Sequence, residues 1–455
     1  MDIEAIKGEI AAFHRGKKWI FTPDVAAAAT PMVDQLSEWG VDDLMIVAGV
    51  EGVGDLPIVE RIHYTRTFGE TIMLGIRAFM ASIESPSAEL LRAVDAFDPT
   101  GEAQVLGQMF SRQSHLAGRP VYGARPVEWR NLEDKTIVDE LWDAVGIARV
   151  PAEVVVVADA PAATERLSGE LGSVWTADNR DGWHGGGEYT RWIREPADVE
   201  PAAEWFHQHA HSVRVMPFLD GLPCSIHGFV TGNGVAVFNP VELLVYRRVD
   251  GPGFFYARGA NFWEPPRVVR AQMREAARSV GALLDERMGY RGGFGIDGVA
   301  TADGFMPTEL NPRLSLGHLT HSRAADFPLG SVERMMIEGD IDIDATDLES
   351  TLLDAAQVRR GGALFQLDSD VPNAKAGYTI DHGGVAHHVD PEEPNDGILR
   401  TGPAAFGTLM VVSCDPDRTP IGPSIAPRML AVVDLARDLW GIELPDLEPA
   451  PDFRS

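Results

Sequence analysis

Two acids, an amide and an arginine lie close together in the second half of the chain. Asp297 lies in one expected strand, and Glu309 and Asn311 lie in the next, with Arg313 two residues further on. Side chains at positions i and i+2 of a strand point to one face, so Glu309 and Asn311 point the same way and Asp297 can lie beside them. Magnesium prefers hard oxygen ligands and usually takes one or two carboxylates together with nucleotide phosphates. The spacing therefore favours a metal site of Asp297, Glu309 and Asn311 over the alternative, a charged sheet end in solvent.

The motif Glu-Leu-Asn-Pro-Arg that ends at Arg313 resembles the E-x-N-P-R signature of the ATP-grasp superfamily. This superfamily includes carbamoyl phosphate synthetases, biotin carboxylases and amino acid ligases, and the resemblance covers roughly residues 125 to 325. It implies that Asp297, Glu309 and Asn311 hold two magnesium ions. It also implies that Arg313 binds the transferred phosphate or the acyl phosphate, so that Arg313, Glu309 and Asn311 are the expected catalytic residues.

Upstream segments resemble the nucleotide-binding parts of the same family. Lys135 lies near the start of an expected helix at residues 131–145, where the family has a lysine that reaches the nucleotide phosphates. An ammonium group there adds to the backbone N–H groups that favour phosphate at a helix start. The segment RVMPFLDGLPCSIHGFV resembles the hinge that contacts adenine, which implies that Met216 and Phe218 line the adenine pocket. The family often has glutamates around this hinge, and this segment has none.

A glycine-rich loop, NRDGWHGGGEYTRW, joins the strands expected at residues 172–177 and 189–193 and resembles the flexible loop that covers the phosphates in the family. Glycine lets backbone N–H groups approach phosphate closely and lets such a lid move. By itself, a glycine-rich hairpin tip is weak evidence of function. The candidate nucleotide-binding residues of this loop are Arg180, His184, Gly185 and Gly186.

Many relatives carry a second phosphate-binding lysine just before this loop, and Thr176 is the nearest equivalent here. The chain has no lysine between Lys135 and Arg313. Phosphate charge in a closing site needs compensation, so we expect Arg191 or Arg180 to supply the missing cation. If both arginines are solvated, the alternative is weak ATP binding or a regulatory relative.

Apolar periodicity predicts the elements that carry these residues, and their alternation predicts an α/β fold. The expected helix at residues 269–288 keeps an apolar stripe that is typical of core packing. The expected strands are at residues 43–48, 154–157, 172–177, 189–193, 212–218, 224–230, 235–245, 293–300 and 304–310.

A chain of 455 residues exceeds what one hydrophobic core usually serves, which predicts several subdomains around a cleft. The resemblance implies an α/β fold of the α+β ATP-grasp type. Its parts would be a Rossmann-like pre-ATP-grasp domain (1–125), a small lobe with the glycine-rich loop (126–205), a large lobe with the metal site (206–330) and a C-terminal α/β segment (331–455).

The formal net charge of −29, with no lysine- and arginine-rich run, argues against nucleic acid or an anionic membrane as partner. The chain has no long apolar stretch and does not begin with the pattern of a signal peptide, so we expect a cytoplasmic protein. Two cysteines are too few for a disulfide framework or a zinc-ligand array.

The resemblance to the ATP-grasp superfamily implies a ligase that uses ATP and Mg²⁺ to activate a carboxylate as an acyl phosphate and couples it to an amine, giving ADP and phosphate. Its substrates would be a small-molecule carboxylate and amine, as in amino acid or dipeptide ligases, and relatives suggest a possible homodimer. The alternatives are a carboxylase-like enzyme that phosphorylates bicarbonate and a non-catalytic ATP-binding regulator.

Overall fold

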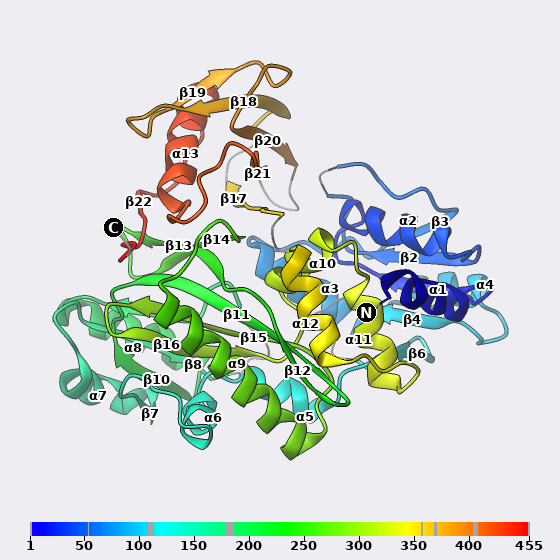
Figure 1. Ribbon diagram of the computed structural model, residues 1–455, viewed down its shortest axis with the longest axis horizontal. Coiled ribbons are helices and arrows are strands. Elements are labelled where there is room, and N and C mark those ends of the chain that lie inside the picture. The colour runs from blue at the N-terminus through cyan, green and yellow to red at the C-terminus, as the bar shows by residue number, and fades with distance from the viewer. Residues whose placement is uncertain are drawn as a thin grey trace.

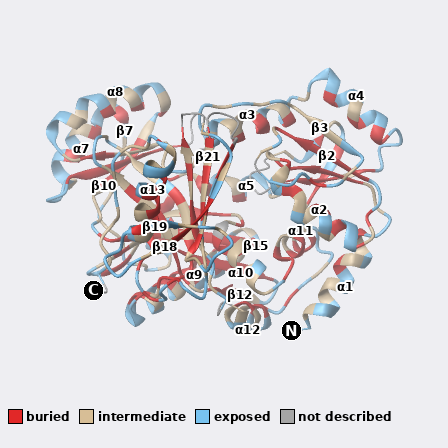
Figure 2. Ribbon diagram, turned by 90° about the horizontal axis from the view of Figure 1, so that it is seen from above, coloured by how far each residue is buried: buried red, intermediate tan, exposed pale blue. Residues whose placement is uncertain are grey.

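The structure is a computed structural model that describes residues 2–52, 54–107, 113–178, 185–355, 358–367, 371–403 and 408–453. Within these ranges the strands form four β-sheets, and helices pack against them (Figure 1). Buried residues, drawn red in Figure 2, follow the strands and the inner faces of the helices. None of the helices described is long and apolar enough to cross a membrane.

The first sheet is mostly parallel and has the strand order β3-β2-β1-β4-β6-β5, in which β5 pairs antiparallel with β6. Every residue of β1 and β2 is buried because helices cover both faces. Trp19 packs on the side of α1 and α2, and Ile20 packs on the side of α3 and α4. This arrangement confirms the predicted Rossmann-like part. Its elements are α1 (Ile3–His14), β1 (Trp19–Thr22), α2 (Thr30–Glu38), β2 (Leu44–Ala48), β3 (Arg61–Tyr64), α3 (Ile72–Glu84), α4 (Ala88–Phe97), β4 (Gln104–Gly107), β5 (His115–Leu116) and β6 (Arg119–Tyr122).

The second sheet is antiparallel, with the order β7-β10-β8-β9. The side chain of Trp175 on β8 is fully buried against Phe206, and its Nε1 donates to Thr164 Oγ1 at 2.7 Å. A tryptophan thus fixes two helices to this sheet. The elements are α5 (Val127–Arg130), α6 (Val138–Ala144), β7 (Glu153–Val156), α7 (Ala160–Leu167), β8 (Ser173–Ala177), β9 (Thr190–Ile193), α8 (Val199–His209) and β10 (Ser212–Pro217).

The third sheet has the order β14-β13-β11-β15-β16, with β12 paired to β11 and β22 paired to β13. One strand expected at residues 235–245 is two, because Pro240 lacks an N–H and interrupts the ladder between them. The helix α9 packs on the sheet through Met273 and Val280, as its stripe predicted. The elements are β11 (Leu222–Thr231), β12 (Gly234–Val237), β13 (Val241–Arg248), β14 (Phe254–Ala260), α9 (Arg267–Met288), β15 (Gly292–Thr301) and β16 (Gly304–Asn311).

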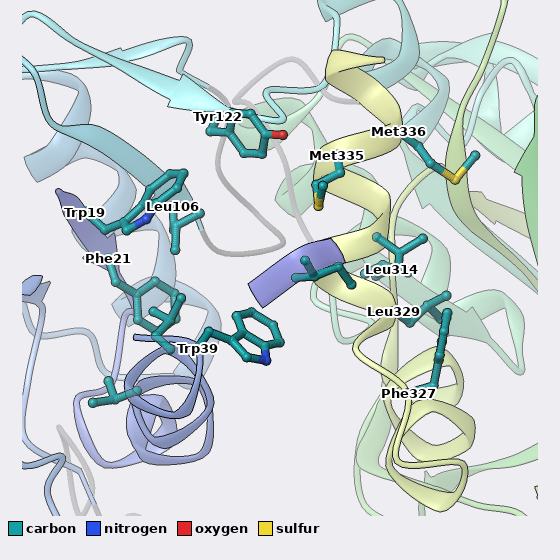
Figure 3. Packing of buried hydrophobic residues seen from close by; sticks show 14 of the residues in the cluster. Trp19, Phe21, Trp39, Leu106, Tyr122, Leu314, Phe327, Leu329, Met335 and Met336 are labelled. Atoms are coloured by element: carbon teal, nitrogen blue, oxygen red, sulfur yellow. The ribbon is translucent and has the colours of Figure 1, made fainter. Parts of the chain in front are cut away.

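The last part of the chain does not form one unit. Its helices α11 and α12 share a core with the first sheet, in which Leu329 and Met335 lie opposite Trp19 and Trp39 (Figure 3). The fourth sheet is antiparallel, with the order β17-β21-β20-β18-β19. The elements are α10 (Leu316–Ala324), α11 (Leu329–Glu338), α12 (Ala345–Ala355), β17 (Gly362–Leu367), β18 (Ala374–Ile380), β19 (Ala386–Val389), β20 (Gly397–Pro403), β21 (Thr408–Cys414), α13 (Ala426–Trp440) and β22 (Leu447–Glu448).

Candidate active site

The hairpin of β15 and β16 brings the predicted metal ligands together. Asp297 lies directly opposite Glu309, and the Nδ2 of Asn311 donates to Asp297 Oδ2 at 3.0 Å. A register shift follows Asp297, so the ladder is irregular next to the acids. Burial and then the neighbouring charge of Glu309 raise the pKa of Asp297 to about 6. Two carboxylates this close repel each other when both are ionised, and a bound cation would reduce that repulsion.

This donor set fits magnesium. Two carboxylates and one amide oxygen are hard ligands, and Mg²⁺ usually takes its remaining ligands from water and nucleotide phosphates. In the part of the chain that the structure describes, no three His, Cys, Asp or Glu side chains gather into a metal site on their own. Asp297, Glu309 and Asn311 could hold the ion only together with such outside ligands.

Lys135 is a buried cation at the same acids. Its Nζ lies 3.1 Å from Glu309 Oε1, and its side chain is only 7% exposed. The expected helix at residues 131–145 is shorter than predicted, because the Asp134 side chain accepts hydrogen bonds from the N–H and hydroxyl of Thr136. Lys135 lies in the resulting turn, which directs it inward instead of leaving it on a solvated helix face.

Arg313 is held in place by two oxygens. Its Nη2 donates to Asn311 Oδ1 at 2.9 Å, and its Nε donates to Glu133 Oε1 at 3.1 Å. Arg125 also lies 3.6 Å from Glu133, which is 8% exposed. Sequence reasoning missed Glu133, because nothing in a short acidic segment 180 residues away indicates that it anchors this arginine.

These residues line a cavity of about 1270 Å³ between the parts of the chain. The wall includes β14 and β16, the start of α3 and the edge of β17. Ile72 N donates to Gln366 Oε1 at 2.8 Å, which joins α3 to β17 across the cavity wall. The first domain, through α3, and the fourth sheet, through β17, thus both contribute to the cleft, as a site built between domains requires.

The glycine-rich loop enters this cleft where it is described. Gly186 and Gly187 have positive φ angles of 62° and 78°, which favour glycine. Glu188 accepts from both Nη atoms of Arg77 on α3, at 2.7 and 3.3 Å. The loop therefore docks on the first domain, with Gly185 and Gly186 in the cavity wall. The two other candidates, Arg180 and His184, lie outside the described residues.

Thr176 occupies the position of the missing lysine, and two arginines line the same cavity. Thr176 pairs with Arg214 across β8 and β10, and Arg214 makes two hydrogen bonds to Asp139 at 2.9 and 2.8 Å. Arg191 lies 3.8 Å above the ring of Trp205 and donates to the carbonyl oxygens of Glu188 and Thr190. Both arginines line the cavity while holding the small sheet and the loop in shape. That Arg191 or Arg180 supplies the missing cation stays a prediction.

Arg258 is a cation of the cleft that sequence reasoning missed. No hydrogen bond or ion pair joins its side chain to another described residue, and burial lowers the pKa of the guanidinium. Its φ of 108° lies in a region that residues other than glycine rarely adopt. Backbone strain of this kind persists where surrounding structure enforces it and often marks a functional site. A strand sequence gives no sign of this angle, which is why the residue was not found.

Tyr256 lies two residues before Arg258 on β14 and lines the same cavity. Its side chain is 42% exposed, and it borders the cavity. Partial withdrawal from solvent in the cleft, and then the charges of Asp297 and Glu309, raise the pKa of Tyr256 above its usual value. Tyr256 is thus a protonated hydroxyl at neutral pH, available as a hydrogen-bond donor beside the acids.

The predicted adenine hinge is aromatic. Phe218 stacks on Trp192 with ring centroids 4.2 Å apart and planes 18° apart, and Phe254 continues the stack. Met216 is 6% exposed and packs with them. Phe218 N donates to Gly172 O at 3.0 Å, which fixes the hinge to the small sheet. The hinge offers an apolar surface for a flat ring.

No protein-family model and no curated protein matches the sequence. Solved structures are similar to it in fold. Biotin carboxylase from Campylobacter jejuni, in a β,γ-ATP complex, has a TM-score of 0.56 at 13% identity, covering 94% of this chain and 93% of that one. L-amino acid ligase from Bacillus licheniformis has a TM-score of 0.51 at 14% identity, covering 95% and 100%.

A third similar structure is N5-carboxyaminoimidazole synthase from Aspergillus clavatus, in complex with ADP and 5-aminoimidazole ribonucleotide. Its TM-score is 0.51 at 11% identity, with 93% of this chain and 99% of that one covered. All three have the fold of ATP-grasp carboxylate-amine ligases. The fold class that the motif at Arg313 predicted is therefore confirmed, and the likeness in fold extends beyond residues 125 to 325 to nearly the whole chain.

Proposed function

We propose that the protein is an ATP-dependent ligase that activates a carboxylate as an acyl phosphate and couples it to an amine. The observation that carries this proposal is the meeting of Asp297, Glu309, Asn311, Lys135 and Arg313 in one cleft of an ATP-grasp fold. Acids for a metal ion and cations for phosphates are what phosphoryl transfer from ATP requires.

The reaction has two balanced steps. A carboxylate oxygen of the substrate attacks the γ-phosphorus of ATP, and the bond between that phosphorus and ADP breaks. The amine nitrogen then attacks the acyl carbon, phosphate leaves, and the amine loses a proton. Bound magnesium would lower the negative charge of the phosphate oxygens. Neither step needs a covalent enzyme intermediate.

Each cleft residue has a role in this proposal. Lys135 binds the ATP phosphates, and Arg313 stabilises the transferred phosphate, oriented by Glu133 and Asn311. Arg258 supplies positive charge that the absent second lysine would provide, together with Arg191 or Arg180. Preorganised charge aimed at the transferred group is the largest catalytic contribution in such sites. Met216 and Phe218 receive adenine.

Bicarbonate is a second candidate for the activated acid, because the fold is similar to that of a biotin carboxylase as well as that of an amino acid ligase. Both reactions begin with phosphorylation of a carboxylate, so the same acids and cations serve both. Small-molecule partners, a cytoplasmic location and a homodimer belong to this proposal. The boundaries at residues 125 and 205 are likewise part of it, whereas the boundary at residue 330 is not, because Leu329 and Val332 lie in the same core.

The test is a screen of amino acids in pairs, and of bicarbonate with amines, for ADP release, with products identified by mass spectrometry. We expect ADP and phosphate, and hydroxylamine should trap the activated acid as a hydroxamate. Glu309→Gln provides the control for contaminating ATPase. Stoichiometric AMP would contradict an acyl phosphate. Tight ATP binding without turnover for any acid would support a regulator instead.

A further inference from the structure

Four arginines form a stripe on the first half of α9. Arg267, Arg270, Arg274 and Arg278 are spaced by three, four and four residues, so they share one face of the helix over about 16 Å. They line a groove of about 1090 Å³ whose other walls include Pro265 and Phe453 near the end of the chain. None of these residues borders the ATP-grasp cleft. The stripe is unusual in a chain with a formal net charge of −29.

Two of the four arginines have structural partners. Arg274 donates to the carbonyl oxygens of Val237 and Phe238 at 2.9 and 3.0 Å, and it pairs with Glu349 of α12. Arg278 lies 3.2 Å from the same carboxylate. One carboxylate thus serves two guanidinium groups, which are held in fixed positions. They tie α9 to β12 and α12, and they leave excess positive charge along the groove.

Arg267 and Arg270 have no such structural partners among the described residues. No hydrogen bond or ion pair joins the side chain of Arg267 or Arg270 to another described residue, and the Nε of Arg270 is buried without a partner. The acids of the groove are engaged elsewhere: Glu264 pairs with Arg359 at 2.7 Å, and Glu275 accepts from Ser279 Oγ at 3.3 Å. Arg267 is exposed and Arg270 is half-buried, so both guanidinium groups can reach a ligand, and an anion in the groove would supply the partner that the Nε of Arg270 lacks.

The position of these arginines opposes the helix dipole. The first turn of α9 contains Arg267 and Arg270 and no acid, and no side chain caps it among the residues described. Acids are favoured at a helix N-terminus and cations at the C-terminus, so two arginines here destabilise the helix when nothing is bound. Free N–H groups, the dipole and two unpaired guanidinium groups all attract an anion to one place.

We infer that this groove binds a small phosphate-bearing anion at a site separate from the ATP-grasp cleft. The planar fork of arginine matches two phosphate oxygens, and the fixed Arg274 adds a third positive group without further ordering. The ligand is a small molecule because the stripe is short and the chain as a whole has a formal net charge of −29, which repels a polyanion.

The test uses the full chain and inorganic phosphate, followed by calorimetry and thermal unfolding. Arg267→Ala/Arg270→Ala should weaken phosphate binding by about tenfold, the effect of losing charged hydrogen bonds. The matched control is Arg287→Ala, an exposed arginine in the last turn of the same helix, which should leave the affinity unchanged. Equal affinity in the double variant and the control would overturn the inference.

A second measurement separates a binding site from a solvated helix face. Arg267→Glu should raise the unfolding temperature without ligand, because it agrees with the dipole, and should abolish the further rise that phosphate causes. Arg287→Glu should do neither. Repeating the titration with ADP shows whether the phosphate group belongs to a nucleotide. If the groove binds ADP more tightly than phosphate, the ligand is a nucleotide. If it binds ADP more weakly, the ligand is free phosphate. Unchanged phosphate stabilisation in Arg267→Glu would contradict the site.

Discussion

At the level of single residues, the proposed metal site depends on the negative charge of Glu309. Glu309→Gln replaces one carboxylate oxygen by an amide nitrogen, which cannot coordinate a cation, and it removes the negative charge that pairs with Lys135. We expect turnover to fall by more than tenfold, about 1.4 kcal/mol in the barrier, while the fold is retained. Steady-state ADP release and circular dichroism measure the two effects. A variant that kept more than about a tenth of the wild-type rate would refute the metal assignment.

Arg258 offers a test in which activity and stability should change in opposite directions. Arg258→Gly removes the guanidinium and also relieves the strain of a φ of 108°. We expect the variant to be more stable by about 1 kcal/mol and to lose at least tenfold in turnover. Chemical unfolding and ADP release give both numbers.

The comparison is Arg191→Ala, which removes the cation that the sequence predicted at this place. Arg191 stacks on Trp205 and bonds to loop carbonyls, so its loss should raise the apparent ATP constant and also loosen the loop. A large loss in Arg258→Gly with little change in Arg191→Ala would assign the missing charge to Arg258. The opposite pattern would assign it to Arg191.

The residues that sequence could predict are those fixed by local geometry. Glu309 and Asn311 share a face because a strand alternates, and Asp297 follows from one hairpin register. Glu133 and Arg258 could not be found, because the first depends on a contact distant in the chain and the second on a backbone angle. Such features depend on packing, which local sequence does not express.

At the level of elements, the glycine-rich loop is held by a helix of another domain. Arg77 of α3 pairs with Glu188 at 2.7 Å, and the Thr71 hydroxyl donates to Glu188 at 3.4 Å. The side chains of the pair are 25% and 20% exposed, so the pair is worth about 0.5–1 kcal/mol. This contact favours the position in which the loop covers the cleft.

We therefore expect Arg77→Glu and Glu188→Arg each to raise the ATP KM about threefold, and the double variant to recover much of the loss. The measurement is a double-mutant cycle on KM and kcat. Arg92→Ala, an exposed arginine on α4, is the control that should change neither constant. If the double variant shows only the sum of the two single losses, the pair does not hold the loop.

Elements with a strong local pattern were predicted well. The strands at residues 43–48 and 172–177 and the helix α9 lie where periodicity placed them. The helix near Lys135 was too long, because the hydrogen bonds of Asp134 outweigh helix periodicity there. The strands of the fourth sheet were not predicted individually, although four of them are six or seven residues long, because the chain after residue 329 was assigned only as a further α/β segment.

At the level of the whole molecule, the ends of the chain tie its parts together. The helices α11 and α12 complete the core of the first domain, and β22 returns to pair with β13. The sequence suggested a separate C-terminal segment, because a shared core leaves no mark in composition. The cleft is therefore enclosed by parts that are linked through several buried contacts.

The contact between β13 and the start of α13 should make the stability of the protein depend on pH. Glu242 of β13 is 1% exposed and accepts hydrogen bonds from the Ser424 hydroxyl and, at 3.0 Å, from Ile425 N, at the start of α13. Burial raises the pKa of Glu242 from 4.5 to about 7, against the effect of these hydrogen bonds. Between those two pH values the folded protein binds more protons than the unfolded chain. The free energy of unfolding must therefore fall as pH rises from 4.5 to about 7, and this contribution levels off above it.

Two buried histidines act in the opposite direction over part of this range. Burial lowers the pKa of His14 and His318 to about 3, so they favour the fold increasingly as pH rises towards 6.5. The measurement is therefore a difference: urea unfolding of wild type and Glu242→Gln at pH 5 and pH 8. Altered hydrogen bonds in the variant add a constant offset, whereas the titration of Glu242 adds a slope of up to about 3 kcal/mol that only the wild type has. Stability should thus fall further from pH 5 to pH 8 in the wild type than in the variant. Parallel pH profiles would mean that Glu242 is already ionised in the fold at pH 5, and that this link between the third sheet and α13 is held by a charged carboxylate.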